Sequence, residues 1–276
     1  MFQLHSITDF DDPRLKPFRT LRAQMDHLHR ECFVAEGEKV VRRMLESPCE
    51  VVSVLMPPKW VSTYEPLLAA RPEPIDLFVA EREILEKLTG FSLFQGVLGL
   101  SRVPSASSLD HLRNLTAPAL LAAVDGLTSA ENVGTVVRNL VALGGQGLVV
   151  GETSAHPYLR RAVRSSMGTI FKLPYLISPC LVDTLVELRR FGVRCVAAHP
   201  HVDQRWLWDV DLTQPTCVVL GAEGEGLRPE VLAVCDEAAA IPMSQTVDSL
   251  NVANAAAVFL AEALRQRRVR VEGSMH

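Results

Sequence analysis

The chain has 276 residues and a formal net charge of −4, with 48% apolar and 22% charged residues. A chain of this length can bury a sizeable core, and its length favours two domains over one. A net negative charge argues against a protein that coats nucleic acid indiscriminately, although it allows a local basic face. No apolar run reaches the length that spans a membrane, and the acidic N-terminus is unlike a signal peptide. We therefore expect a cytoplasmic protein.

The first 103 residues predict a small α/β domain. β-branched runs such as Val51–Met56 alternate with helical patterns, which is typical of a layered α/β unit. The range 14–30 predicts a helix, and its basic side chains include Arg19 and Arg22, with Asp26 the only acid among them. A solvated helix face is one interpretation, but a local basic cluster in an acidic protein favours contact with nucleic-acid phosphates.

The segment 103–108 reads VPSASS and has the composition of a hinge. We place the first domain at residues 1–103, a linker at 104–117 and a second domain at 118–276. Short apolar runs such as Leu120–Val124 alternate with helical patterns such as Asn132–Leu143 in the second part. This alternation predicts an α/β domain with a mostly parallel sheet and helices on both faces.

Several familiar kinds of site are disfavoured. The glycines of Gly221–Gly226 are spaced GxxGxG rather than GxGxxG, and the chain has no Walker lysine, so an NAD or ATP site is not expected. His199 and His201 have no further ligand at metal spacing, which favours an ordinary loop. The six cysteines lack CxxC spacing and suggest buried free thiols. Trp206 and Trp208 could stack on bases, but their mixed neighbourhood favours packing.

Polar or glycine-rich motifs follow the predicted strands of the second domain. NVGTVVR (Asn132–Arg138) opens a helix, and GAEGEGL (Gly221–Leu227) follows a buried apolar run. IPM (Ile241–Met243) ends the next strand, and SLNV (Ser249–Val252) leads into the last helix, for which Asp248 and Ser249 are the expected caps. Strand ends and a helix start of this kind meet at one edge of an open sheet, where α/β folds bind ligands.

These motifs, in this order, resemble those of the SpoU/TrmH ribose methyltransferases of the SPOUT superfamily. The resemblance implies S-adenosylmethionine as methyl donor, a ribose 2′-OH of ribosomal or transfer RNA as acceptor, a trefoil knot and a homodimer. Two shorter stretches, Phe33–Val40 and Gln95–Gly99, resemble the ribosomal-protein-like substrate-binding domain that precedes some SpoU catalytic domains. A non-catalytic RNA-binding or assembly factor on the same fold is the alternative, and the intact polar residues of the motifs favour the enzyme.

The resemblance also implies roles for individual residues. Arginine stays protonated in proteins, so we expect Arg138 to act as an electrostatic clamp on the developing alkoxide, with a transiently deprotonated guanidine as the other option. Glu223 is expected to pair with Arg138 or a neighbouring donor. The side chains expected to hold the ribose and Arg138 are Asn132, Ser249 and Asn251, although capping is the simpler role for Asn132 and Ser249.

Two further groups complete the expected site. Backbone atoms and apolar walls should hold the cofactor, at Gly221, Gly224, Ile241, Met243 and Leu250. RNA contacts are expected from the basic side chains of the range 14–30 and from a second basic cluster over His156–Lys172, which contains no acid. The residues are Arg160, Arg161, Arg164, Arg19 and Arg22. No metal is expected.

Overall fold

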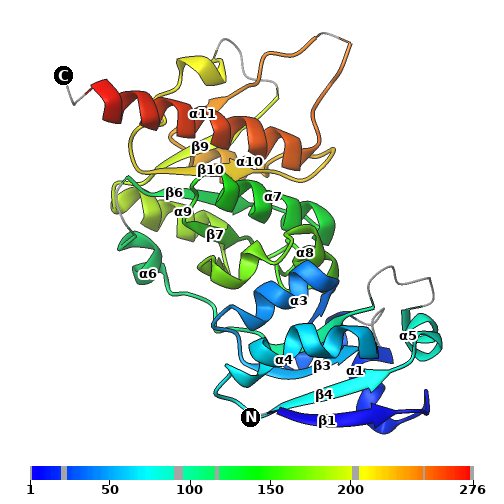
Figure 1. Ribbon diagram of the computed structural model, residues 1–276. Coiled ribbons are helices and arrows are strands. Elements are labelled where there is room, and N and C mark those ends of the chain that lie inside the picture. Colours follow the sequence, from blue (N-terminus) through cyan, green and yellow to red (C-terminus); the bar gives the residue numbers. More distant parts are fainter. Residues whose placement is uncertain are drawn as a thin grey trace. The chain divides into compact units, whose positions relative to one another are not determined.

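The computed structural model of the protein describes residues 2–19, 24–89, 96–115, 118–200, 205–244 and 246–273. Its internal contacts divide the chain into two compact units (Figure 1). Unit 1 consists of Met1–Ser105 and Tyr158–Lys172, and unit 2 consists of Ala106–Pro157 and Leu173–His276. The boundaries 1–103, 104–117 and 118–276 stay a prediction, and the structure differs from them in assigning the short segment Tyr158–Lys172 to unit 1.

Unit 1 is built on a five-stranded sheet of order β1-β4-β3-β5-β2. β1, β4 and β3 run parallel, whereas β5 runs antiparallel to both β3 and β2. The sequence missed β1, because its residues are largely polar or exposed, as an edge strand allows. The strands are β1 (Phe2–Ile7), β2 (Cys32–Glu36), β3 (Val51–Met56), β4 (Ile75–Ala80) and β5 (Leu98–Arg102).

The helices of unit 1 include one after β2 and one after β4, which agrees with the predicted alternation of strands and helical patterns. The predicted helix over 14–30 is instead divided, within the described residues, into a 3₁₀ turn and two short helices. Leu15 and Phe18 are fully buried and anchor this segment in the core. The elements are η1 (Pro13–Leu15), α1 (Lys16–Arg19), α2 (Gln24–His29), α3 (Glu38–Leu45), η2 (Pro58–Trp60), α4 (Val61–Ala69) and α5 (Arg82–Thr89).

The segment Tyr158–Lys172 forms α8 (Arg160–Ser165) and η3 (Thr169–Lys172) within unit 1. The ring of Phe33 lies 4.9 Å from that of Tyr158 and 5.4 Å from that of Phe171, measured between centroids. Next to these rings the carboxylate of Glu36, which is only 5% exposed, accepts hydrogen bonds from the guanidinium groups of Arg160 and Arg164. An aromatic cluster and a nearly buried ion pair therefore join α8 to β2.

Unit 2 contains a six-stranded sheet of order β11-β9-β10-β6-β7-β8. Every described pair in it is parallel, which confirms the predicted parallel sheet. The central strands β6 and β10 are buried throughout and consist of apolar runs with a single threonine. The strands are β6 (Leu120–Val124), β7 (Gly147–Val150), β8 (Tyr175–Ile177), β9 (Arg194–Ala198), β10 (Thr216–Leu220) and β11 (Glu237–Ala239).

Helices cover both faces of this sheet. α7 (Ala130–Ala142) and α11 (Val252–Gly273) lie against each other, as Figure 1 shows. One face of α7 carries Val133, Val136, Val137 and Leu140, all buried as the apolar spacing predicted. Leu181, Leu185 and Leu188 of α9 enter a separate buried cluster on the sheet. The remaining elements are α6 (Leu109–Arg113), α9 (Leu181–Arg190), η4 (Leu207–Asp209) and α10 (Pro229–Ala233).

Candidate functional site

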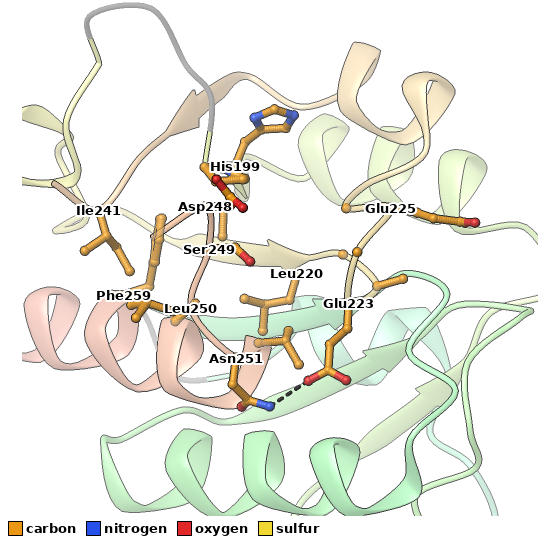
Figure 2. A pocket seen from close by; sticks show the side chains of 18 of the residues that line it. His199, Leu220, Glu223, Glu225, Ile241, Asp248, Ser249, Leu250, Asn251 and Phe259 are labelled. Atoms are coloured by element: carbon orange, nitrogen blue, oxygen red, sulfur yellow. Dashed lines mark hydrogen bonds between the residues drawn. The ribbon is translucent and has the colours of Figure 1, made fainter. Parts of the chain in front are cut away.

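A pocket of about 600 Å³ lies at the carboxyl ends of β9, β10 and β11 (Figure 2). Its walls come from the residues that follow these strands and from the first turns of α11, including Ala255 and Phe259. The volume is in the range of pockets that enclose a small organic ligand. The three predicted motif regions after β10, after β11 and before α11 therefore meet at one edge of the sheet, as expected for an α/β fold.

The glycine motif forms a tight turn after β10. The backbone N–H of Ala222 donates to the carbonyl of Gly226 at 2.9 Å, and the N–H of Gly226 donates back at 3.0 Å. Gly224 and Gly226 have φ values of +87° and +73°, a region that glycine adopts readily. A Cβ on Gly221 would lie 2.2 Å from the carbonyl carbon of Gly226, so the crossing of the chain excludes any side chain there.

The turn presents Glu223 to two asparagine amides from other parts of unit 2. Its Oε1 accepts hydrogen bonds from Nδ2 of Asn132 at 2.7 Å and from Nδ2 of Asn251 at 2.6 Å. Nδ2 of Asn251 also lies 3.3 Å from Oδ1 of Asn132. Figure 2 shows Glu223 and Asn251 pointing toward each other at the pocket. Residues from α7, from the turn after β10 and from the loop before α11 thus form one polar cluster, which the sequence had proposed as site residues.

Asn251 also caps α11. Its Oδ1 accepts the backbone N–H of Ala253 at 2.9 Å, and the helix begins at Val252. The expected capping by Asp248 and Ser249 is therefore wrong, because both residues lie in the loop before Asn251 and line the pocket instead. One asparagine side chain consequently holds both the helix start and the carboxylate of Glu223.

Arg138 is not part of this cluster. It is exposed on α7 and makes no hydrogen bond or ion pair with the described residues. Six positions along an α-helix correspond to about 120° around the axis, so Arg138 and Asn132 lie on different faces. Glu223 pairs with the asparagines, the neighbouring donors, rather than with Arg138.

The residues expected to hold a cofactor all line the pocket. These are Gly221, Gly224, Ile241, Met243 and Leu250. The sequence missed Phe259, although it lies one helical turn after Ala255 on α11, and the spacing i, i+4 places both on one helix face. His199, interpreted from sequence as part of a strand-end loop, follows β9 directly and lines the pocket too.

The pocket lining is acidic as well as apolar. Glu223, Glu225 and Asp248 line it, and its lining residues include no lysine or arginine. Carboxylates beside apolar walls suit a ligand that joins a positive charge to a flat heterocycle. S-adenosylmethionine has this character, with a sulfonium and an adenine, so the residues present fit that cofactor.

A buried ion pair that the sequence did not reveal anchors the glycine turn. Asp125 is 1% exposed, and its carboxylate accepts the backbone N–H of Arg228 at 3.0 Å and the Nε at 2.8 Å. The same guanidinium contacts Glu152 at 2.7 Å, and Glu152 in turn accepts the N–H of Leu181 at 2.9 Å. Burial alone would raise the pKa of Glu152, but the hydrogen bonds from Arg228 and the backbone lower it overall. The turn is thus tied to the ends of β6 and β7 and to the start of α9.

The predicted RNA-contacting arginines have mixed surroundings, and their role stays a prediction. Arg19 donates to Asp11 at 2.8 Å, so part of the basic cluster near the N-terminus is neutralised locally. Arg160 and Arg164 share the carboxylate of Glu36, and only Arg164 of the two keeps a largely exposed side chain. Arg161 is exposed, and Arg22 lies outside the described residues.

The parallel sheet and the acidic pocket at its edge are consistent with a methyltransferase that uses S-adenosylmethionine. The chain belongs to the SpoU rRNA Methylase family, whose model matches residues 119–261. The predicted family, enzyme class and cofactor are thereby confirmed.

Similarity extends beyond the family domain. An uncharacterized tRNA/rRNA methyltransferase of Mycobacterium tuberculosis is 32% identical over 271 residues, covering 95% of this chain and 92% of the relative. The 23S rRNA (guanosine-2′-O-)-methyltransferase RlmB of Ralstonia nicotianae is 33% identical, covering 74% of this chain and 82% of the relative. The SpoU methyltransferase AviRb of Streptomyces viridochromogenes, crystallised with S-adenosylmethionine, is 30% identical with a TM-score of 0.78, covering 94% of this chain and all of that one. Within the described ranges no helix is long and apolar enough to cross a membrane.

Proposed function

We propose that this protein transfers a methyl group from S-adenosylmethionine to a ribose 2′-OH of ribosomal or transfer RNA. The observation that carries the proposal is the cluster of Asn132, Glu223 and Asn251 at the edge of the cofactor pocket. The cluster offers fixed amide and carboxylate groups where a sugar hydroxyl and the cofactor must meet. RlmB, which methylates guanosine at the 2′-O position of 23S rRNA, supports ribosomal RNA as the first substrate to test.

The proposed methyl transfer does not require a general acid from the protein. Bound S-adenosylmethionine supplies an electrophilic methyl group whose leaving thioether is neutral. One carboxylate oxygen of Glu223 has no hydrogen bond among the described residues, so this oxygen can accept a hydrogen bond from a ribose hydroxyl. Ser249 lines the pocket and adds a hydroxyl that can donate to the sugar or a phosphate. These groups orient the ribose rather than perform covalent catalysis.

Arg138 is proposed as the electrostatic clamp, although within one chain it lies outside the cluster of Asn132, Glu223 and Asn251. It is exposed on α7, and Val141 on the same helix is 36% exposed, so this face is open. The proposed homodimer covers this face, together with part of α11 where Ala257 and Ala261 are not buried. Light scattering tests the assembly, and a stable monomer at micromolar concentration would contradict it.

The N-terminal unit is proposed to read the RNA, with Arg161 and Arg164 as exposed basic side chains of α8. Because the proposed substrate is ribosomal or transfer RNA, the protein is expected to work in the cytoplasm, where ribosomes assemble.

Total RNA from cells lacking this protein is the substrate for the decisive test. Incubation with purified protein and S-adenosylmethionine, followed by mapping of ribose methylation, should show a 2′-O-methylated position that is absent without protein. The matched variant is Glu223→Gln, which can keep Oε1 as the acceptor for both amides but replaces the other carboxylate oxygen and its charge with an amide N–H₂ donor, and it should transfer less methyl than wild type. Methylation on a base, or no transfer to any RNA by wild type, would contradict the proposal. Cofactor binding without transfer would favour a non-catalytic RNA-binding factor.

A further inference from the structure

Two tryptophan side chains are exposed in the segment that pairs with the residues before the pocket wall. Trp206 is 45% exposed and Trp208 is 51% exposed, whereas Leu207, Val210 and Leu212 in the same segment are buried. A buried tryptophan removes up to about 250 Å² of surface from water, so leaving half of two indoles in solvent forfeits considerable stabilisation. The sequence favoured packing for both rings, and the structure shows the smaller apolar residues packed instead.

The segment that carries the tryptophans is held firmly by the backbone. The N–H of Ala240 donates to the carbonyl of Arg205 at 3.0 Å, and the N–H of Leu207 donates to the carbonyl of Ala240 at 2.8 Å. These bonds make an isolated parallel bridge between Trp206 and Ala240, one residue before Ile241 of the pocket wall. Trp206 therefore belongs to a fixed edge beside the cofactor pocket, and Trp208 lies two residues further along the same segment.

A second anchor fixes the far end of the segment. Nε2 of Gln266, on α11, donates to the carbonyl of Val210 at 2.9 Å, and its Oε1 accepts the N–H of Leu212 at 2.8 Å. Neither tryptophan ring stacks on another ring or donates a hydrogen bond among the described residues. The indole faces and N–H groups are thus available to a ligand.

The charges around the rings are balanced. Arg194 and Arg205 both contact the carboxylate of Glu237, which is largely covered, and Asp209 supplies an exposed carboxylate. A balanced surface offers little to phosphates, so binding must come from the ring faces.

We propose that Trp206 and Trp208 form a stacking surface for unpaired nucleobases of the RNA substrate, next to the residues that bind the cofactor. The inference rests on the proposed function, since it takes RNA as the substrate. Every base has a π face, and stacking on aromatic side chains is how proteins hold single-stranded RNA. The surface would keep nucleotides near the target splayed out of a helix.

Tryptophan fluorescence reports on this surface directly. The chain has three tryptophans, and Trp60→Phe leaves only the two of the surface. Titrating this variant with a short single-stranded oligoadenylate should quench the emission, and a blunt RNA duplex should quench it much less. Absence of quenching by the oligoadenylate overturns the proposal, even where methylation of ribosomal RNA is intact.

Affinity measurements supply the second arm. Trp206→Ala and Trp208→Ala should each weaken oligoadenylate binding roughly five- to a hundredfold, the range for removing one stacking partner. The factor should be similar at low and high salt, and Trp→Phe at either position should restore most of it. The matched control is Phe191→Ala, a 41% exposed aromatic at the end of α9, which should bind as wild type does.

Three readouts separate the possible failures. S-adenosylmethionine affinity should be unchanged in both alanine variants, so a parallel loss would point to a distorted pocket and overturn the stacking role. A change in oligomeric state would show that the tryptophans bind a second copy instead. Quenching and weakened binding without any 2′-O-methylation would support the surface and contradict the proposed function.

Discussion

Removing the side chain of Arg228 should destabilise unit 2 by about 2–3 kcal/mol. Breaking a buried ion pair costs about 3–5 kcal/mol, because the remaining charge is left without compensation. Asp125 is 1% exposed and would lose the Nε donor while keeping the backbone N–H of residue 228. The Arg228 side chain is 33% exposed, so water can replace part of the pair, and we place the cost below the full range.

Arg228→Met is the informative change because it keeps much of the volume. Urea unfolding in the Trp60→Phe background, followed by fluorescence, reports on unit 2, which holds the remaining tryptophans. The control is Arg190→Met, whose partner Glu187 is on the surface, and it should cost at most about 0.5 kcal/mol.

A double-mutant cycle with Asp125→Asn completes the test of the pair. The double variant has no buried charge left without a partner. Its loss of stability should therefore be about 1–3 kcal/mol smaller than the sum of the losses of the two single variants. Additive effects, or a cost for Arg228→Met no larger than that of the control, would refute the assignment of this pair as the anchor of the turn. S-adenosylmethionine affinity should fall with the stability of the turn, as calorimetry can show.

Three further predictions concern single residues. Arg138→Ala should keep the fold and cofactor binding, since the side chain is exposed and outside the pocket, while the rate of methyl transfer falls about 10²–10³-fold. Arg138→Lys should restore little of that rate, and a lysine variant as fast as wild type would exclude a bidentate clamp. Glu223→Gln should weaken binding of S-adenosylmethionine more than that of its demethylated product, because only the donor carries a sulfonium charge, and equal calorimetric losses would contradict this. Burial lowers the pKa of His156 from 6.5 to about 4. The contribution of its neutral form to the free energy of unfolding should therefore be complete above pH 6.5 and decline as the pH falls toward 4. His156→Gln should make the free energy of unfolding depend less on pH over this range.

The sequence was most informative where local chemistry decides the structure. Buried runs such as Leu120–Val124 and the turn Gly221–Gly226 were predicted because apolar strands and glycine turns have local signatures. The meeting of Asn132, Glu223 and Asn251 was predicted through the family motifs, since no local rule joins residues so far apart in the chain. The trefoil knot stays a prediction, and no periodicity could have indicated it.

Other features could not be derived from sequence because they depend on tertiary partners. Nothing near Asp125 indicates that its partner is Arg228, about a hundred positions later. The arginines of α8 suggested a surface for phosphates, yet Arg160 is largely covered by its contact with Glu36. The apolar residues around Trp206 do not predict that Leu207, Val210 and Leu212 are buried while the tryptophan itself stays exposed, because a hydrophobicity pattern does not encode which of them packs.

The segment Tyr158–Lys172 has a consequence for how the chain matures. Tyr158 and Phe171 supply core contacts to Phe33, so unit 1 is incomplete until residues well past β6 and β7 have left the ribosome. Domains usually fold in the order of synthesis, N-terminal first, but here the leading unit must wait for a part supplied by the middle of the chain. A nascent chain stopped before residue 158 should therefore expose the ring of Phe33, and a transplanted N-terminal unit would need those fifteen later residues supplied as a separate peptide or a fused segment.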